Sequence, residues 1–308
     1  MSGGKQITLL DGGMGQELVR RAGKATALWS TQALIDAPQD VAAVHRDYAD
    51  AGATMATSNT YALHRDRLGG GSSNHYAAAG TDIQDMQDQL EDLYTLALDA
   101  AESVRDAGRV AGSIGPLGAS YRPDLWPAHE DAVRLLTEIV GFLSPRADVL
   151  LFETLPSVAA ARSGVEAGRT RDLPVWLSFT VDDADGSRLR SGEPLSAVAG
   201  IAAEADAVLI NCSVPEVIPA ALEALAPCGV PLGAYANGFT KITEAFIAGG
   251  TTADGLTARK DLTPEVYADQ AMSWLDHGAT ILGGCCEVGP AHIAEIARRL
   301  KAAGHTII

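Results

Sequence analysis

Three of the four cysteines in this chain follow short apolar runs, at the points where buried strands would end. Cys285 and Cys286 are adjacent and close the run 280–284, and Cys212 closes the run 207–212. Adjacent cysteines seldom form a disulfide, because one peptide bond holds their Cα atoms too close together. Two thiolates from one turn and a third from another strand end form a soft ligand set for zinc, with one position left open. An open position is what a catalytic zinc needs, so the pattern predicts an enzyme that acts on a thiol.

Two other interpretations of these cysteines remain open at this point. Three buried and unreactive cysteines would be the simplest, but Gly283 and Gly284 permit a sharp backbone path that lets both neighbouring side chains reach one ion. A redox protein would instead form a reversible disulfide between Cys285 and Cys286 and would bind little zinc. Cys228 lies in a turn before a later strand, at the opposite face, and we interpret it as structural.

Two acidic residues also follow apolar runs. Asp11 begins a glycine-rich segment and Glu153 closes the run 148–153. A lone buried carboxylate is costly, so each acid must be paired or must face a ligand. Two such acids on one rim could bind the ammonium group of an amino acid, whereas the simpler alternative is that each caps a helix or bonds nearby amides. Gly12 and the glycines beside it would let the backbone approach a substrate carboxylate.

Two weaker candidates follow other apolar runs. Tyr61 could reach the open metal position or the substrate, although a tyrosine at a strand end more often packs against its neighbours. Asn237 closes the seventh run and is a candidate pocket residue. The sequence contains no dinucleotide fingerprint and no Walker motif, and its histidines show no metal-binding spacing.

The elements that would position these residues repeat along the chain. An apolar run, a break rich in glycine, proline or asparagine, and a longer helical stretch recur eight times. The runs are nearly continuous rather than alternating, which is typical of parallel strands covered on both faces. The expected strands are 7–11, 53–59, 109–114, 148–153, 175–180, 207–212, 232–236 and 280–284. The expected helices are 39–51, 82–107, 130–142, 157–168, 194–205, 215–225, 264–276 and 290–303.

Eight such units in 308 residues predict an α/β protein with a (β/α)8 TIM barrel as a single domain over residues 1–308. The long breaks after the strands, including the segment 69–73, follow carboxyl ends of strands, where such barrels build their active sites.

Composition limits the partners. The chain has 23 basic and 39 acidic residues, a net charge of −16, which argues against nucleic acid or an anionic membrane surface as a partner. Four cysteines are too few for a disulfide scaffold, and we see neither a signal peptide nor a membrane-spanning run. We therefore expect a cytoplasmic protein that acts on small molecules, as a monomer or a homodimer.

At this point the sequence resembles a known family. The matching segments are 10–18, 28–30, 48–53, 112–118, 152–157, 176–180, 210–213 and 278–286. They are similar to those of the zinc-dependent homocysteine S-methyltransferases, which include the S-methylmethionine-dependent and betaine-dependent enzymes, and to the homocysteine-binding module of methionine synthase. The paired cysteine motif is the most specific, and the Leu-Trp-Ser segment 28–30 is closest to the S-methylmethionine type.

The resemblance implies a (β/α)8 barrel with zinc held by three thiolates, here Cys212, Cys285 and Cys286. It implies that the acids Asp11 and Glu153 contact the amino group of homocysteine, and that Tyr61 lies near the metal. The expected reaction is zinc-dependent transfer of a methyl group from S-methylmethionine or S-adenosylmethionine to homocysteine, which gives methionine.

The sequence departs from the family pattern after two of the expected strands. Glu287-Val288-Gly289 follows the cysteine pair, Ala236 replaces the usual proline before Asn237, and the segment 238–263 is unlike that of the S-methylmethionine type. Betaine or dimethylsulfoniopropionate as donor and selenohomocysteine as acceptor therefore remain as alternatives. A zinc- or thiol-binding protein without turnover remains open as a separate class.

Overall fold

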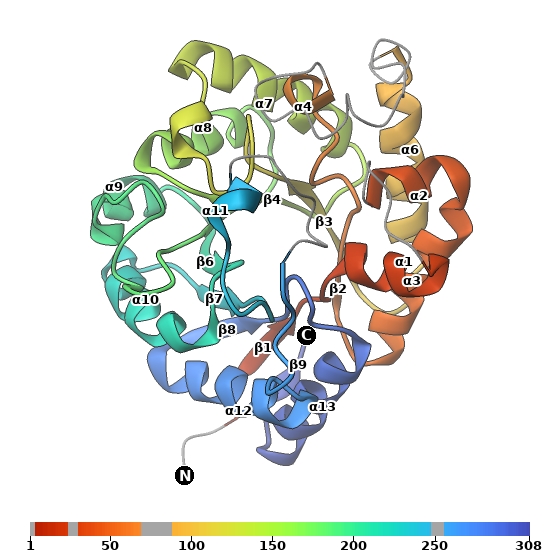
Figure 1. Cartoon of the computed structure of the whole chain (residues 1–308), viewed down its shortest axis with the longest axis vertical. Coiled ribbons are helices and arrows are strands. Elements are labelled where there is room, and N and C mark those ends of the chain that lie inside the picture. Colours follow the sequence, from red (N-terminus) through yellow and green to blue (C-terminus); the bar gives the residue numbers. More distant parts are fainter. Residues whose placement is uncertain (1–3, 24–29, 69–87, 248–255) are drawn as a thin grey trace.

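The continuous apolar runs form one parallel sheet that curls into a barrel, with the helices around it (Figure 1). The computed structural model describes residues 4–23, 30–68, 88–247 and 256–308. Within these ranges the strands of the ring are β1 (Gln6–Leu9), β2 (Met55–Thr57), β3 (Arg109–Ile114), β4 (Val149–Leu155), β5 (Val175–Phe179), β6 (Ala207–Asn211), β7 (Leu232–Tyr235) and β8 (Ala279–Leu282). The predicted α/β barrel is confirmed.

Every strand of the ring pairs in parallel with its neighbours, in the order β2 to β8 and then β1. The ring closes between β1 and β2, where Leu10 and Met55 form a parallel bridge and the Thr54 amide donates to the Leu9 carbonyl over 2.7 Å. A short strand β9 (Thr306–Ile307), which we did not predict, pairs with Gln6 and Ile7 at the amino end of β1. Closure brings the carboxyl ends of strands distant in sequence to one rim.

The helices follow most of the predicted ranges. They are α1 (Met14–Ala22), α2 (Ser30–Asp36), α3 (Pro38–Asp50), α4 (Arg65–Leu68), α6 (Leu90–Glu102), α7 (His129–Leu143), α8 (Val158–Gly168), α9 (Ala199–Ala202), α10 (Ile218–Leu225), α11 (Glu244–Ile247), α12 (Pro264–Trp274) and α13 (Pro290–Ala302). The 3₁₀ helices are η2 (Pro123–Leu125), η3 (Leu195–Val198), η4 (Pro215–Val217), η5 (Ala226–Cys228) and η7 (Leu275–His277).

Several predicted boundaries were wrong. The expected helix 194–205 is instead the short pair η3 and α9, consistent with the low helix propensity of Gly200 within it. The expected helix 82–107 begins in residues outside the described part and ends as α6 at Glu102, before a turn in which the Ala107 amide donates to the Val104 carbonyl. The helices α1, α2, α4 and α11 were not predicted, and the predicted flexible segment 69–73 lies outside the described residues.

Side-chain alternation divides each strand between two cores. On β4, Leu150 and Phe152 pack toward the helices, while Val149 and Leu151 pack inside the ring. The inner cluster is apolar and consists of Leu10, Met55, Ala111, Val149, Leu151, Trp176, Ala207, Leu209, Tyr235 and Ile281. The same alternation turns Glu153 into the barrel above this cluster, so the strand geometry itself places an acid at the mouth.

No helix within the described residues is long and apolar enough to cross a membrane.

Candidate metal and substrate site

The three cysteines predicted to converge do so at the barrel mouth. Cys212 follows β6 directly, and Cys285 and Cys286 lie a few residues beyond β8. Their sulfur atoms all lie within 4.8 Å of one another, and Cys212 Sγ is 3.9 Å from Cys286 Sγ. Cys212 has a φ of +47°, a left-handed conformation uncommon outside glycine, at the point where the chain leaves β6.

The two glycines before the cysteine pair are required for space. A Cβ atom at Gly284 would lie 2.1 Å from Val288 Cγ1, and one at Gly283 would lie 2.7 Å from Leu10 Cβ. The backbone of this turn is therefore packed directly against β1 and the following loop. Any larger residue would displace the turn that carries both cysteines.

Cys212 and Cys285 are joined by a disulfide in this structure, and Cys286 is a free thiol. The bond links the segment after β6 to the segment after β8, and it does not join the adjacent residues Cys285 and Cys286 to each other. This differs from the redox alternative, which expects a disulfide between Cys285 and Cys286. Burial raises the pKa of the Cys286 thiol to about 12. Cys228 lies at the end of η5, away from this cluster, where it is buried.

The donor set fits a metal ion once the disulfide is reduced. Zinc–sulfur bonds of about 2.3 Å in a tetrahedral arrangement separate the sulfur atoms by roughly 3.8 Å. The observed 3.9 Å between the sulfurs of Cys212 and Cys286 is close to that spacing. Thiolate sulfur is also the ligand that favours zinc over calcium or magnesium. The cluster is therefore able to bind a metal ion.

Asp11 lies just beyond β1 and is almost fully buried. Its carboxylate accepts hydrogen bonds from the Thr57 amide over 2.7 Å and the Thr57 hydroxyl over 2.6 Å. Burial outweighs these bonds and raises the pKa of Asp11 to about 7. His45 Nδ1 is 3.9 Å away, but burial lowers the pKa of His45 to about 4, so it is neutral and supplies no charge. Asp11 therefore lacks a cationic partner among the described residues.

Glu153 occupies the other side of the mouth. It accepts hydrogen bonds from the Ser113 hydroxyl and, over 2.9 Å, from the Tyr235 hydroxyl. Burial nevertheless raises its pKa. The pairing of β4 with β5 shifts register here, and Thr154 has a φ of +58°. Such irregularities re-aim a side chain, and here the strand presents Glu153 to the cavity.

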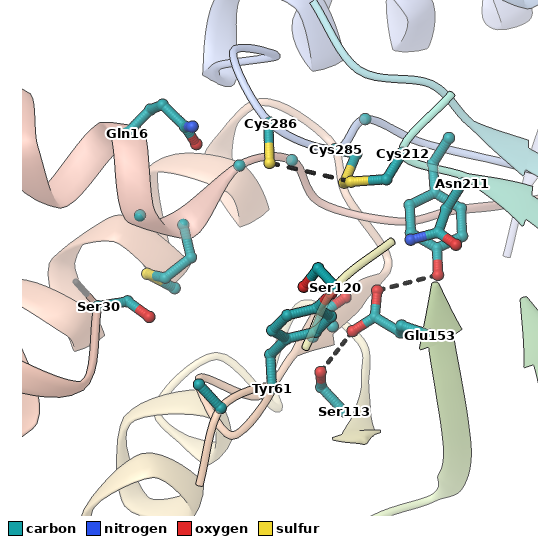
Figure 2. A pocket seen from close by; sticks show the side chains of 18 of the residues that line it. Gln16, Ser30, Tyr61, Ser113, Ser120, Glu153, Asn211, Cys212, Cys285 and Cys286 are labelled. Atoms are coloured by element: carbon teal, nitrogen blue, oxygen red, sulfur yellow. Dashed lines mark hydrogen bonds between the residues drawn. A yellow bond between two sulfur atoms is a disulfide. The ribbon is translucent and has the colours of Figure 1, made fainter. Parts of the chain in front are cut away.

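One cavity of about 260 Å³ joins these groups (Figure 2). In that view the cysteine sulfurs lie above Glu153, and Tyr61 and Ser120 lie beside it. The predicted site residues that line it are Asp11, Gly12, Tyr61, Glu153, Cys212, Cys285 and Cys286. The Tyr61 hydroxyl is 2.8 Å from the Ser120 hydroxyl. Polar and metal-capable groups at or just beyond the carboxyl ends of β1, β2, β4, β6 and β8 therefore share a single chamber.

Asn237 is not among the described residues that line this cavity. Asn237 is buried, and its side-chain oxygen accepts from the Phe239 amide over 3.1 Å. Glu287 is one of the departures from the family pattern. Its Oε2 lies 3.4 Å from Nη2 of Arg20 on α1, and Glu287 is also not among the described residues that line the cavity. These two residues therefore shape the loops around the mouth in this structure.

Sequence reasoning missed several lining residues, namely Gln16, Ser113, Arg67, Asn211 and Tyr235. Gln16 is buried beside Cys286 and offsets part of the rise in its pKa, yet its Nε2 lacks an acceptor in hydrogen-bond geometry among the described residues. Asn211 accepts from the Thr154 amide and the Ser178 hydroxyl, each over 2.9 Å. Asn211 was visible as a polar residue closing an apolar run, the same signal that identified Asp11 and Glu153.

A parallel barrel with a sulfur cluster and two buried acids at its carboxyl-end mouth defines an enzyme scaffold that is able to bind a metal. A family model described as Homocysteine S-methyltransferase matches residues 8–300. The chain belongs to the homocysteine S-methyltransferase family and is a methyltransferase.

Two curated relatives show how far the similarity extends. A homocysteine S-methyltransferase of Escherichia coli is 30% identical over 96% of this chain and 96% of its own length. Homocysteine S-methyltransferase 4 of Zea mays is 29% identical over 96% of this chain and 90% of its own length. The similarity therefore covers nearly the whole barrel, including the segments from β1 to β8 that carry the site.

Solved structures agree. The metallated form of the homocysteine methyltransferase MmuM from Escherichia coli superposes with a TM-score of 0.75 at 29% identity, covering 96% of both chains. Its oxidized form gives a TM-score of 0.74 at 29% identity, covering 95% of this chain and 96% of that one. The similarity to the S-methylmethionine type in segment 28–30 falls mostly on residues 28 and 29, which lie outside the described part.

Proposed function

We propose that this protein transfers a methyl group from a sulfonium donor, S-methylmethionine or S-adenosylmethionine, to the thiol of L-homocysteine, and that it uses zinc to do so. The observation that carries the proposal is the meeting of three cysteine sulfurs and two buried acids in one cavity. A thiol activator and an ammonium-binding site in one cavity suit an amino acid that carries a thiol.

Zinc is the expected metal, held by Cys212, Cys285 and Cys286 in their reduced form. When bound, the ion would lower the pKa of a substrate thiol and keep its sulfur nucleophilic at neutral pH. The Escherichia coli relative has been solved in both metallated and oxidized forms. This supports reduction of the disulfide between Cys212 and Cys285 as a precondition for metal binding here.

Asp11 and Glu153 would bind the ammonium group of homocysteine. Burial raises the pKa of both acids, so an incoming cation is the partner that each lacks. Thr57 holds the carboxylate of Asp11, and Ser113 and Tyr235 hold that of Glu153, so neither has to reorganise when substrate binds. Fixed acids align the substrate, and alignment is a large part of what an enzyme can contribute to group transfer.

The methyl step needs no general base on the chain. A lone pair on the homocysteine sulfur forms the new S–C bond, and the electrons of the broken bond return to the donor sulfur, which becomes a neutral thioether. Tyr121, Phe239 and Phe246 line the cavity, and aromatic walls both exclude water and attract a sulfonium cation. Loss of the donor's positive charge during transfer suits this apolar setting.

Other donors with the same chemistry are the alternative to be tested. Betaine and dimethylsulfoniopropionate also carry a cationic methyl-bearing centre, and selenohomocysteine could replace homocysteine as acceptor. The loop after β7 borders the cavity through Phe239, Phe246 and Ile247. Because this loop differs from that of the S-methylmethionine type, it is the segment expected to set the donor.

The direct test is a methyl-transfer assay on protein purified with reductant and loaded with zinc. Homocysteine is offered with each donor in turn, with and without a chelator, and methionine is quantified. We expect methionine with a sulfonium donor and loss of product with chelator that returned zinc restores. Activity that survives complete metal removal, or methionine formation from none of the donors, would overturn the proposal.

A further inference from the structure

One cation lines the cavity in the described part of the chain, the guanidinium of Arg67. It lies on α4, in the segment that follows β2 and Tyr61. The proposed function gives ligands to the thiol and to the ammonium group of an amino acid. It leaves the third polar group of such a substrate, the carboxylate, without a side-chain partner.

The guanidinium is held in a fixed orientation. Its Nε donates to the Pro116 carbonyl over 3.1 Å, and its Nη2 donates to the Ser120 hydroxyl over 3.2 Å. Its central carbon lies 5.1 Å from the centre of the Tyr61 ring, and the Tyr61 hydroxyl contacts Ser120 in turn. These contacts use the Nε edge of the planar group, which leaves the end formed by Nη1 and the second Nη2 hydrogen for a ligand.

In the described ranges the direct contacts of Arg67 are with Pro116, Ser120 and Tyr61, and none of them is an ion pair with an acid, although the chain carries a net charge of −16. Asp66 is its neighbour in sequence, but that carboxylate accepts from the Gly118 amide over 2.6 Å and lies 3.3 Å from His64. Arg190 offers a useful comparison, since it also stacks on a cavity tyrosine, Tyr121, but is paired with Asp183 at 2.7 Å. The charge of Arg67 helps to lower the pKa of Asp66, but the two groups form no direct ion pair. A preoriented guanidinium that lines a ligand cavity without a directly paired acid is suited to bind a carboxylate.

We infer that Arg67, supported by Ser120 and Tyr61, binds the carboxylate of an α-amino acid substrate in this cavity. The inference rests on the proposed function. Asp11 and Glu153 then face the ammonium group and Arg67 faces the carboxylate, so the cavity matches the charges of a zwitterion. Both homocysteine and S-methylmethionine carry that carboxylate, and the experiment separates the two.

The test compares each ligand with its decarboxylated analogue in the wild-type protein and in R67Q. Homocysteine is compared with 3-aminopropane-1-thiol, and S-methylmethionine with (3-aminopropyl)dimethylsulfonium, by the KM of each. Binding of methionine and of 3-(methylthio)propylamine is measured by calorimetry, which needs no turnover. R190Q is the matched control, because Arg190 also stacks on a tyrosine at the cavity but does not line it.

Because R67Q removes a charged hydrogen bond, we expect it to reduce the affinity for one carboxylate-bearing ligand by about 10- to 100-fold. Its decarboxylated analogue should change by about 2-fold or less, as should every ligand in R190Q. A rise in KM confined to homocysteine assigns the carboxylate to the acceptor, and a rise confined to S-methylmethionine assigns it to the donor. R67K, which keeps the charge but not the planar fork, should fall between wild type and R67Q.

Two results would overturn the inference. One is an R67Q protein that binds every carboxylate-bearing ligand as tightly as wild type does. The other is an R67Q protein that loses affinity equally for each ligand and for its decarboxylated analogue, which would indicate a structural role for Arg67. A wild-type protein that forms no methionine would defeat the proposed function alone. The calorimetric comparison would still decide the role of Arg67.

Discussion

The inside of the barrel has two layers that the same strands build from opposite kinds of residue. In the lower layer β4 and β6 contribute Val149, Leu151 and Leu209, all buried and apolar. One inward position further along, the same two strands contribute Glu153 and Asn211, also buried but polar. The change occurs within a single step of the strand alternation.

The contrast shows where stability and function separate. The lower layer is stabilised by removal of apolar surface from water. The upper layer takes carboxylates out of water, which costs free energy and raises the pKa of Asp11 and Glu153. Its hydroxyl and amide partners offset only part of that cost. A cationic ligand can offset the rest of the cost of burying these carboxylates, so the upper layer is organised for binding.

The largest effect is expected from the sulfur cluster above the upper layer. Cys286→Ala should bind zinc weakly and lose at least about 100-fold in activity, because changes even in groups behind metal ligands cost 10- to 100-fold. Cys228→Ala, a change of the buried cysteine outside the cluster, should retain both. For both variants, the zinc content is measured by mass spectrometry of the metal, and the rate of methyl transfer is measured by assay. Full zinc in Cys286→Ala would contradict the ligand assignment.

In the lower layer, Leu151→Ala should reduce the free energy of unfolding by about 2–5 kcal/mol, because Leu151 is fully buried and the change leaves a cavity. The rate per folded molecule should stay near that of wild type. Urea unfolding and kinetics at low temperature test both. A variant of unchanged stability but poor turnover would show that the two layers are not separate.

Glu153→Gln reverses that pattern in the upper layer. The substitution keeps the shape and an acceptor for Ser113 and Tyr235 but removes the charge that binds ammonium. We expect the KM for homocysteine to rise by about 10-fold or more, the size of one charge-assisted hydrogen bond. Stability should stay equal or increase, because a buried charge has been removed. A large loss of stability with unchanged KM would place Glu153 in the structural layer.

The smallest effect is a pH dependence. The folded protein raises the pKa of Asp11 from 3.8 to about 7, so between these values the folded state holds a proton that the unfolded chain has released. Stability attributable to Asp11 therefore falls as pH rises across that range. Ammonium binding needs the ionised acid, so methionine should bind more tightly as pH rises through 7, and less steeply in Asp11→Asn. Calorimetry of methionine, which has no thiol to titrate, would show this, and identical pH profiles for both proteins would contradict it.

The sequence predicted the ring and most of its chemistry because both depend on local patterns. The strand β3 has the bounds that the apolar run indicated, and Cys212, Glu153 and Asp11 were recognised as polar or sulfur residues that close such runs. These positions are determined by strand alternation and by the closure of the barrel, which bring every strand end to the same rim.

The rest depends on packing between segments distant in sequence. Arg67 and Gln16 lie on helices that no apolar run marks, and they line the cavity only because α4 and α1 pack beside it. The predicted pocket residue Asn237 instead bonds its own loop at Phe239. The disulfide between Cys212 and Cys285 also could not be read from spacing, since the residues are 73 positions apart.

The central claim is that three cysteine sulfurs hold zinc and present it to the thiol of homocysteine. X-ray absorption at the zinc edge of the reduced, zinc-loaded protein tests this directly. The account predicts three sulfur neighbours at about 2.3 Å before substrate is added and a fourth after homocysteine binds. A zinc ion with oxygen or nitrogen neighbours only, or a sulfur count that homocysteine leaves unchanged, would contradict it.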